Sequence, residues 1–179
     1  GTNLERNLYL STQIMELGIP VVMAINMMDL VQKSGNKIHI DKLSKKLGCE
    51  VVEISALKGT GIMKAAEKAI SAAQSKKKTI PVHEFAQDVE DAIKSVENKL
   101  TGTVAEAQKR FFAIKLIEKD DKIVEQMKSV PDVSYEVKAL EDKFDDDTES
   151  IITNERYVYI SSIIGQCYTK SSTGKKLTT

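Results

Sequence analysis

The continuous apolar run from Ile19 to Ile25 is the feature that most constrains how this chain can fold. A strand exposed on one face alternates apolar and polar residues, whereas an unbroken apolar run of this length is typical of a strand buried on both faces. Such strands occur in parallel sheets that helices cover on both sides. We therefore predict a buried strand over residues 20–26.

Helix and strand patterns alternate over the first 75 residues. The spacing predicts helices over residues 3–17 and 38–47, a second strand over residues 50–55, and a third helix that opens at Gly61. We expect Gly18 and Gly48 to end the first two helices. The inward residues are predicted to be Leu4, Leu8, Ile14 and Leu17 in the first helix and Ile40, Leu43 and Leu47 in the second. The alternation predicts an α/β fold with parallel strands, here the C-terminal part of a larger domain, since two strands alone do not make a stable covered sheet.

The remainder of the chain predicts an all-α domain. Residues 76–82 are a polar linker that contains Pro81, and residues 83–168 show helical spacing without a convincing strand. The first of these helices is expected to bury Phe85, Val89, Ile93, Val96 and Leu100. A capping-box pattern from Thr103 to Glu106 predicts a further helix start. Residues 169–179, rich in Ser, Thr and Lys, are predicted to be a flexible tail, which completes a division into 1–75, 76–82, 83–168 and 169–179.

Bulk properties exclude several classes of protein. The chain has 179 residues, with 26 basic and 26 acidic side chains and a formal net charge of zero, so no global field favours a nucleic acid. Cys49 and Cys167 belong to no metal or redox motif and are predicted to be reduced thiols. No apolar run is long enough to cross a bilayer, so the chain itself is expected to be soluble.

The residues that follow the first predicted strand give the clearest indication of a ligand-binding role. Asn26 and Asp29 come directly after it, three residues apart. Guanine presents two adjacent donors, the ring N1–H and the exocyclic amine, and one carboxylate such as that of Asp29 can accept from both. Adenine has no N1 proton and carries its amine elsewhere, so the same carboxylate would reject it. The Asn26 side-chain amide can bridge the base edge and a neighbouring loop.

A second polar segment, Ser55-Ala56-Leu57, follows the second predicted strand. We expect the Ala56 N–H to point at the guanine carbonyl oxygen, Ser55 to hold the loop, and Met27 to lie against the base. Both segments follow parallel strands, and open α/β sheets bind ligands at the carboxyl ends of their strands. Each motif alone is common: Asn-x-x-Asp is also a plain strand-end turn, and without a guanine site Met27 is more simply explained as a packing residue.

Other short motifs are incomplete. The pair His83-Glu84 begins a zinc-helix pattern, but Gln87 stands where the second histidine is required. Gly174-Lys175 lacks the Ser or Thr and the upstream glycine of a phosphate-binding loop. The sequence therefore predicts no metal site and no catalytic residue in this chain.

Taken together, these segments resemble the bacterial ferrous iron transport protein B family. The similarity is carried by residues 3–10, by Gly18-Ile19-Pro20-Val21-Val22, by Asn26-Met27-Met28-Asp29, by residues 55–61 and by residues 154–160. It implies the C-terminal part of a Ras-like GTPase domain followed by a helical regulatory domain. By this resemblance, Asn26, Met27 and Asp29 match the fourth GTPase motif, and Ser55, Ala56 and Leu57 match the fifth.

The resemblance also implies cofactors, partners and a location. The parent would bind GTP or GDP with Mg²⁺, would couple hydrolysis to Fe²⁺ uptake through a membrane domain of the same polypeptide, and would place this region at the cytoplasmic face of the bacterial inner membrane. The phosphate loop, the threonine switch and the Asp-x-x-Gly motif would all precede residue 1, and no ligands for Mg²⁺ or Fe²⁺ are expected here. We therefore expect the chain by itself neither to hydrolyse GTP nor to bind it tightly.

An alternative from a different class remains open. The chain could be a non-enzymatic helical interaction module that forms homo-oligomers through the incomplete α/β part, because an incomplete parallel sheet leaves strand edges and apolar faces uncovered.

Overall fold

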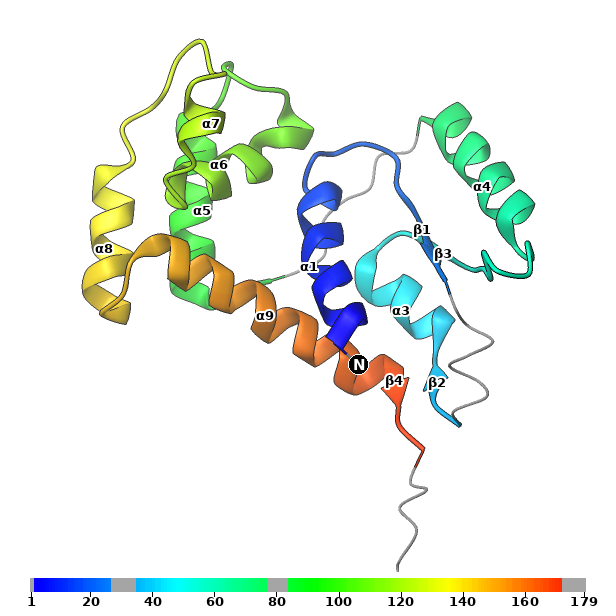
Figure 1. The fold of residues 1–179 in the computed structure, drawn as a ribbon. Helices are drawn as coiled ribbons and strands as arrows, with labels where there is room; N and C mark the ends of the chain where they lie inside the picture. The colour runs from blue at the N-terminus through cyan, green and yellow to red at the C-terminus, as the bar shows by residue number, and fades with distance from the viewer. Residues whose placement is uncertain (1, 27–34, 77–83, 172–179) are drawn as a thin grey trace, which may run out of the picture. The chain divides into compact units, whose positions relative to one another are not determined.

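The computed structural model describes residues 2–26, 35–76 and 84–171. Contacts within it divide the chain into two compact units, each built from two stretches of sequence (Figure 1). The first, named the helical unit, consists of Gly1–Ile19 and Lys78–Ser161. The second, named the sheet unit, consists of Pro20–Lys77 and Ser162–Thr179. The predicted domain boundaries remain predictions, since contacts group residues 1–19 with a distant part of the sequence.

The sheet unit contains short strands and flanking helices. In chain order these are β1 (Val22–Ile25), β2 (Lys37–Ile38), α3 (Ile40–Leu47), β3 (Glu50–Glu53), α4 (Ile62–Ser75) and β4 (Tyr168–Thr169). β1 and β3 pair in parallel, and α3 lies between them in the sequence, because a parallel pair requires a crossover that returns the chain to the same end. This arrangement confirms the predicted α/β fold.

Helix α3 shows how the sequence pattern sets local structure. Leu43 and Leu47 lie one helical turn apart, and both are 1 % exposed. The helix ends at Gly48, whose left-handed backbone (φ 72°) lets its N–H donate to the Ser44 carbonyl oxygen at 2.9 Å. The glycine stop and the burial of both leucines match the prediction, whereas Ile40 is only half-buried.

The antiparallel pair of β2 and β4 was not predicted. Ile38 lies opposite Tyr168, and the Asn36 side-chain oxygen accepts the N–H of Ser171 at 3.0 Å. Strands of two residues carry no periodic signal, and the sequence pattern therefore placed Ile38 in a helix and Thr169 in a tail. The pairing joins residues that follow the helical unit to residues that follow β1.

Helices are the regular elements of the helical unit. They are α1 (Thr2–Met15), α5 (Gln87–Lys99), the 3₁₀ turn η1 (Glu106–Gln108), α6 (Lys109–Ile117), α7 (Asp121–Val124), α8 (Ser134–Phe144) and α9 (Thr148–Cys167). By contacts, α9 belongs to this unit as far as Ser161. The predicted all-α domain is confirmed. Of the helices in residues 2–26, 35–76 and 84–171, none is both long and apolar enough to cross a bilayer.

One apolar core lies among α5, α6, α8 and α9. Helix α5 contacts both α6 and α8 (Figure 1). The buried members of this core are Phe85, Val89, Ala92, Ile93, Val96, Leu100, Ala113, Ile114, Leu116, Ile117, Leu140, Ile151 and Ile152. All five residues predicted for the inner face of the first helix are among them. Burying each large side chain stabilises the fold by about 1.5–3 kcal/mol, so this core accounts for a large part of the unit's stability.

The predicted inner face of α1 is partly wrong. Leu8, Thr12, Met15 and Glu16 are each at most 2 % exposed, whereas Ile14 is 38 % exposed. The first three of these lie three or four residues apart and share one side of the helix. A prediction based on apolar residues alone could not include Thr12 and Glu16, and their burial implies polar partners inside the unit.

The predicted capping box at Thr103 is also wrong. Helix α6 begins at Lys109, after η1, and Ala105 precedes η1 without a side-chain cap. The Thr103 N–H donates to the Leu100 carbonyl oxygen at 3.0 Å, so this threonine belongs to the turn that ends α5. The residues of the expected cap therefore form the turn that ends α5 instead of starting α6.

The burial of Cys49 in the sheet unit offers a test of this fold. Both cysteines are free and buried, and burial raises the pKa of the Cys49 thiol to about 11. Because the thiolate is the reactive form, we expect a Cys167→Ser variant to react with iodoacetamide about tenfold faster for each pH unit between about pH 8 and 9.5, followed by mass spectrometry.

The unfolded variant is the control, because a free cysteine titrates near pH ~8.5 and already reacts readily at pH 8. Folding favours the neutral thiol, so its contribution to stability is present below about pH 8.5 and is lost as the pH rises toward 11. Equal rates for the native and unfolded proteins at pH 8 would contradict the burial.

Candidate functional site

The carboxyl ends of β1 and β3 meet at one edge of the sheet unit. Ile25 lies opposite Glu53, and the Ile54 N–H donates to the Ile25 carbonyl oxygen at 2.9 Å. The parallel pairing therefore continues one residue beyond β3. It brings Asn26 and Ser55, which are far apart in the sequence, to the same edge, where open α/β sheets bind their ligands.

One hydrogen bond joins the two predicted segments directly. The Ala56 N–H donates to the Asn26 side-chain oxygen at 2.9 Å. The amide that was predicted to face a guanine carbonyl oxygen thus contacts Asn26 here, and the Asn26 side chain bridges to the neighbouring loop. Asn26 and Ala56 are both exposed, so the bonded pair lies where a ligand could reach it.

The loop after β3 is closed on itself. Ser55 and Thr60 form an antiparallel bridge in which each N–H donates to the other's carbonyl oxygen, at 2.9 and 3.2 Å. The Ser55 hydroxyl oxygen, in a side chain only 5 % exposed, accepts the Lys58 N–H at 3.4 Å. Leu57, at the tip, is 90 % exposed. This closure holds the Ala56 N–H in place, and Thr60 is a contributor that the sequence pattern did not reveal.

Gly61 fits this loop for two separate reasons. Its φ of 77° lies in the left-handed region, which side chains with a Cβ rarely adopt. A Cβ at this position would lie 2.3 Å from the Glu53 carbonyl oxygen and 3.1 Å from the Ile54 Cα, both of which are backbone atoms. The glycine therefore allows α4 to begin directly against the end of β3 and sets the position of the Ser55–Thr60 loop.

The remaining predicted site residues are Met27 and Asp29, which lie outside the described residues, so their roles stay predictions. The structure brings together Asn26, Ser55, Ala56 and Leu57 at one sheet edge. Within the described ranges, no three His, Cys, Asp or Glu side chains are grouped so that they could hold a metal ion.

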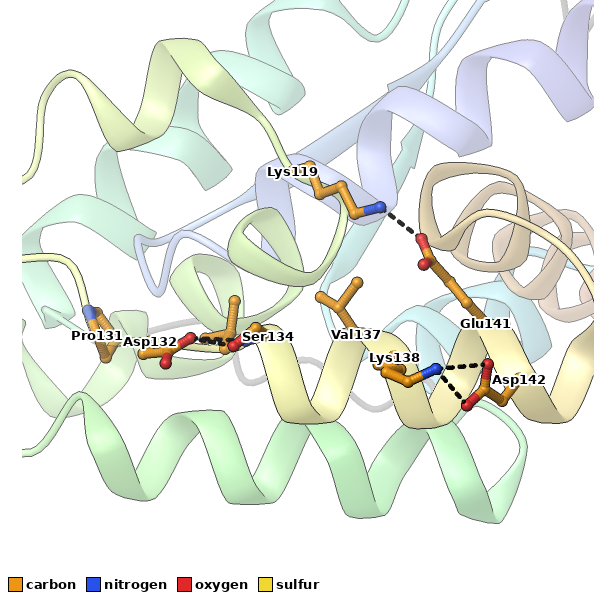
Figure 2. A pocket seen from close by; sticks show the side chains of 9 residues that line it. Lys119, Pro131, Asp132, Ser134, Val137, Lys138, Glu141 and Asp142 are labelled. Carbon is orange, nitrogen blue, oxygen red and sulfur yellow. Dashed lines mark hydrogen bonds and ion pairs between the residues drawn. The ribbon is translucent and has the colours of Figure 1, made fainter.

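A separate hollow lies in the helical unit, beside the start of α8 (Figure 2). Four of its charged side chains form two ion pairs, Lys119 with Glu141 and Lys138 with Asp142 at 3.0 Å. The fifth, Asp132, accepts hydrogen bonds from Ser134. Hydrogen bonds from Ser134 hold the pKa of the Asp132 carboxyl below its usual value. The hollow presents paired charges and one carboxylate held by Ser134 rather than a nucleophile with a base, so the sheet edge is the better candidate for the site.

Comparison with protein families identifies two matching regions. Residues 1–69 match the family described as ferrous iron transport protein B, and residues 85–169 match the FeoB cytosolic helical domain. The gap between the matches contains the end of α4 and the segment that leads to α5.

Curated relatives are iron transporters that are much longer than this chain. It is 36 % identical over 120 residues to the Fe(2+) transporter FeoB of Escherichia coli (strain K12), a match that covers 67 % of this chain and 15 % of that protein. It is 32 % identical over 183 residues to an Fe(2+) transport protein A/Fe(2+) transporter FeoB fusion protein of Porphyromonas gingivalis, covering 94 % and 22 %. The chain thus spans 15–22 % of the length of these two relatives.

Solved structures of NFeoB from S. thermophilus share the fold. A glutamate-to-alanine mutant bound to GDP is 38 % identical with a TM-score of 0.85, and the match covers 94 % of this chain and 66 % of that one. Another glutamate-to-alanine mutant, bound to GMPPNP, is 38 % identical with a TM-score of 0.83, covering 90 % and 65 %.

Two glycine substitutions test the construction of the loop. Gly61 and Gly59 both have positive φ, 77° and 67°, but a Cβ at Gly59 would meet nothing within 4 Å. We expect Gly61→Ala to lower the free energy of unfolding by about 1–3 kcal/mol more than Gly59→Ala, because only the first adds a backbone clash to the conformational strain. Urea titration of both variants measures the difference, and equal losses would show that the Glu53 carbonyl does not restrict this position.

Proposed function

The chain belongs to the ferrous iron transport protein B (FeoB) family, and from this premise we propose that it is the guanine-nucleotide-binding and regulatory region of a GTP-dependent ferrous iron transporter. The sheet unit would recognise the base, and the helical unit would act as the regulatory domain. Support comes from the family matches over both parts of the chain and from NFeoB neighbours that bind GDP and GMPPNP.

The observation that carries this proposal is the hydrogen bond from the Ala56 N–H to the Asn26 side-chain oxygen. It couples the loops after two parallel strands, so that one amide side chain spans the edge where a purine would lie. A base contacting Asn26 would then also meet the Ser55–Thr60 loop, which is already closed. A site ordered before its ligand arrives loses less conformational entropy on binding.

Selectivity for guanine is assigned to Asp29. Its carboxylate would accept from N1–H and from the exocyclic amine, and adenine cannot supply this pair of donors. Sites built on such hydrogen bonds reject the wrong partner by ~10⁴-fold or more, because their polar groups would be left unpaired. Met27 would pack against the base, and Leu57 belongs to the same loop as Ala56. None of these residues is proposed to be catalytic.

The other parts of the nucleotide site are proposed to lie elsewhere in the parent polypeptide. Phosphate and Mg²⁺ would be held by other segments of the parent polypeptide, and Fe²⁺ would be cargo of a membrane domain rather than a ligand of this chain. The region would then work at the cytoplasmic face of the cell membrane, with the guanine nucleotide and the membrane domain as its partners. Hydrolysis belongs to the assembled GTPase domain.

The first test is the Asp29→Asn substitution in the full-length protein. The amide keeps the size of the carboxylate but directs a donor at a guanine donor, and a hydrogen bond to a charged group contributes about 1.5–3 kcal/mol. We therefore expect the preference for GDP over ADP to fall about 10- to 100-fold, measured with fluorescent nucleotides. Asp142→Asn, at an exposed carboxylate of α8, is the control and should leave the preference unchanged. A variant at Asp29 that keeps the full preference would count against the proposed role.

A second candidate function is self-association through the sheet unit, and one observation favours it. Helix α4 has no buried residue, and its apolar residues Ile62, Met63 and Ile70 are 44 %, 72 % and 57 % exposed. Exposed apolar groups of this kind mark interaction surfaces.

The two candidates predict different hydrodynamic behaviour of the 179-residue chain. Self-association predicts a dimer in light scattering that Ile70→Glu converts to a monomer, since a charge cannot be buried unpaired in the interface. Lys64→Glu, on the same helix, is the matched control for a surface charge change. A monomer at all concentrations would exclude self-association and leave the guanine-binding proposal intact.

A further inference from the structure

The zero net charge of the chain conceals a strong separation of charge between its two units. The sheet unit contains 13 lysines and 5 acidic residues, which gives it a formal charge of +8. The helical unit contains 13 basic and 21 acidic residues, which gives it a formal charge of −8. Asymmetry of this size between two parts of a chain indicates that one part meets a polyanionic surface. Such a surface would attract the sheet unit and repel the helical unit.

Several lysines of the sheet unit gather on two neighbouring elements. We name as the lysine patch the five exposed residues Lys37, Lys42, Lys45, Lys46 and Lys170. Helix α3 contributes three of them, which share one side of the helix because they lie three or four residues apart. Asp41 is the one acidic residue in 35–49, and 162–171 contain none. Glu50, the next acidic residue along the chain, pairs with Lys68 at 3.3 Å.

The β2–β4 ladder brings the members of the patch together from distant parts of the sequence (Figure 1). Lys37 lies opposite Thr169, the neighbour of Lys170. The His39 backbone N–H donates to the Cys167 carbonyl oxygen at 2.7 Å, and the His39 Nε2 lies 3.2 Å from the Thr169 hydroxyl. The residues before α3 are therefore fastened to residues 167–169, and lysines from both segments lie at one place in the sheet unit.

A purely structural role for these lysines is too small to account for the surplus of positive charge. Lys45 and Lys46 lie in the last turn of α3. Burial raises the pKa of the Cys167 thiol at the end of α9, and the charges of Lys46 and Lys42 oppose that shift. Lysines near a helix C-terminus stabilise the helix, but two such ends carry only about one negative charge between them. The sheet unit has a surplus of eight positive charges.

A lipid surface with anionic headgroups fits the patch better than a nucleic acid does. Proteins that bind single-stranded nucleic acids add exposed aromatic rings on which the bases stack, whereas Tyr168, the aromatic residue beside Lys170, is half-buried. Clusters of lysines beside a membrane are attracted by its anionic lipids without any such ring. The curated relatives are named as Fe(2+) transporters, and transport takes place at a membrane.

We propose that the lysine patch is a docking surface for anionic phospholipids of the membrane. This inference rests on the proposed function, which places the region at the cytoplasmic face. The ammonium groups pair with headgroup phosphates, and the patch holds the sheet unit against the bilayer by contacts that are individually weak and reversible. A tether to a membrane domain would raise the local concentration of lipid, so a modest affinity is enough.

The test uses the 179-residue chain without nucleotide, and vesicles of phosphatidylglycerol mixed with phosphatidylcholine. We expect the chain to sediment with these vesicles and not with vesicles of phosphatidylcholine alone. Raising the salt concentration from ~0.1 M to ~1 M should release it, because the screening length falls from about 10 Å to about 3 Å. No binding to the anionic vesicles at the lower salt concentration, or equal binding to both kinds of vesicle, would overturn the proposal.

Matched pairs of substitutions separate the patch from net charge. We expect Lys42→Gln with Lys45→Gln to weaken vesicle binding about 25-fold, at about fivefold for each lysine. Lys37→Gln with Lys170→Gln, on the other segment, should weaken it by a similar factor. Lys122→Gln with Lys138→Gln, at exposed positions of the helical unit, removes the same charge and should leave binding unchanged. Equal losses in all three variants would show that net charge drives the binding, and the patch would then have no special role.

Two further measurements identify the partner and the premise. Tighter binding to a DNA duplex than to the anionic vesicles would replace the lipid by a nucleic acid and refute the proposal. The GDP-over-ADP preference of the full-length protein is measured separately. Its absence would refute the proposed function, whereas the vesicle assay contains no nucleotide and tests the lysine patch alone.

Discussion

The parallel pairing of β1 with β3 is the interaction on which the candidate site depends. Its register places Ile25 opposite Glu53, and this choice alone puts Asn26 within hydrogen-bonding distance of Ala56. A slip of one residue would turn every side chain of β1 to the opposite face and separate the two loops. The proposed base recognition therefore depends first on strand register and only then on individual side chains. The glycine at 61 serves the same arrangement, because a Cβ there would clash with the backbone at the end of β3.

The helical unit differs from the sheet edge in that it buries charged side chains. Its apolar core resembles that of any small helical bundle, but Glu16 and Arg156 are as buried as its leucines. Removing one partner of such a pair leaves an unpaired charge in an apolar interior, which is far more destabilising than losing an exposed ion pair. Helix α1, which the family match assigns to the ferrous iron transport protein B region, is, by contacts, an integral part of the helical unit.

Much of the fold and of the candidate site could be predicted from the sequence. The features that were missed have physical explanations. The strand before Asn26 was located by its unbroken apolar run, although its predicted burial on both faces is wrong, since Ala24 is exposed and only Ile25 is fully buried. The buried face of α3 and the inner face of the helix that follows Phe85 carry helical periodicity, so pattern alone located them. The meeting of Asn26 with Ala56 could be anticipated because parallel strands end at one edge. Pairings that depend on distant sequence could not: Arg156 and Glu16 are 140 residues apart, and neither has a local signature. The closing of the loop by Thr60 is likewise a backbone effect without a residue-type signal.

The β2–β4 ladder has a mechanical consequence. Residues 168–171 leave α9 and bind directly to residues 36–38, which follow β1 in the sheet unit. Tension applied to the backbone beyond Ser171 would reach this ladder before it reached the core of the helical unit. Two paired positions resist little force, so the ladder would be the first contact to open.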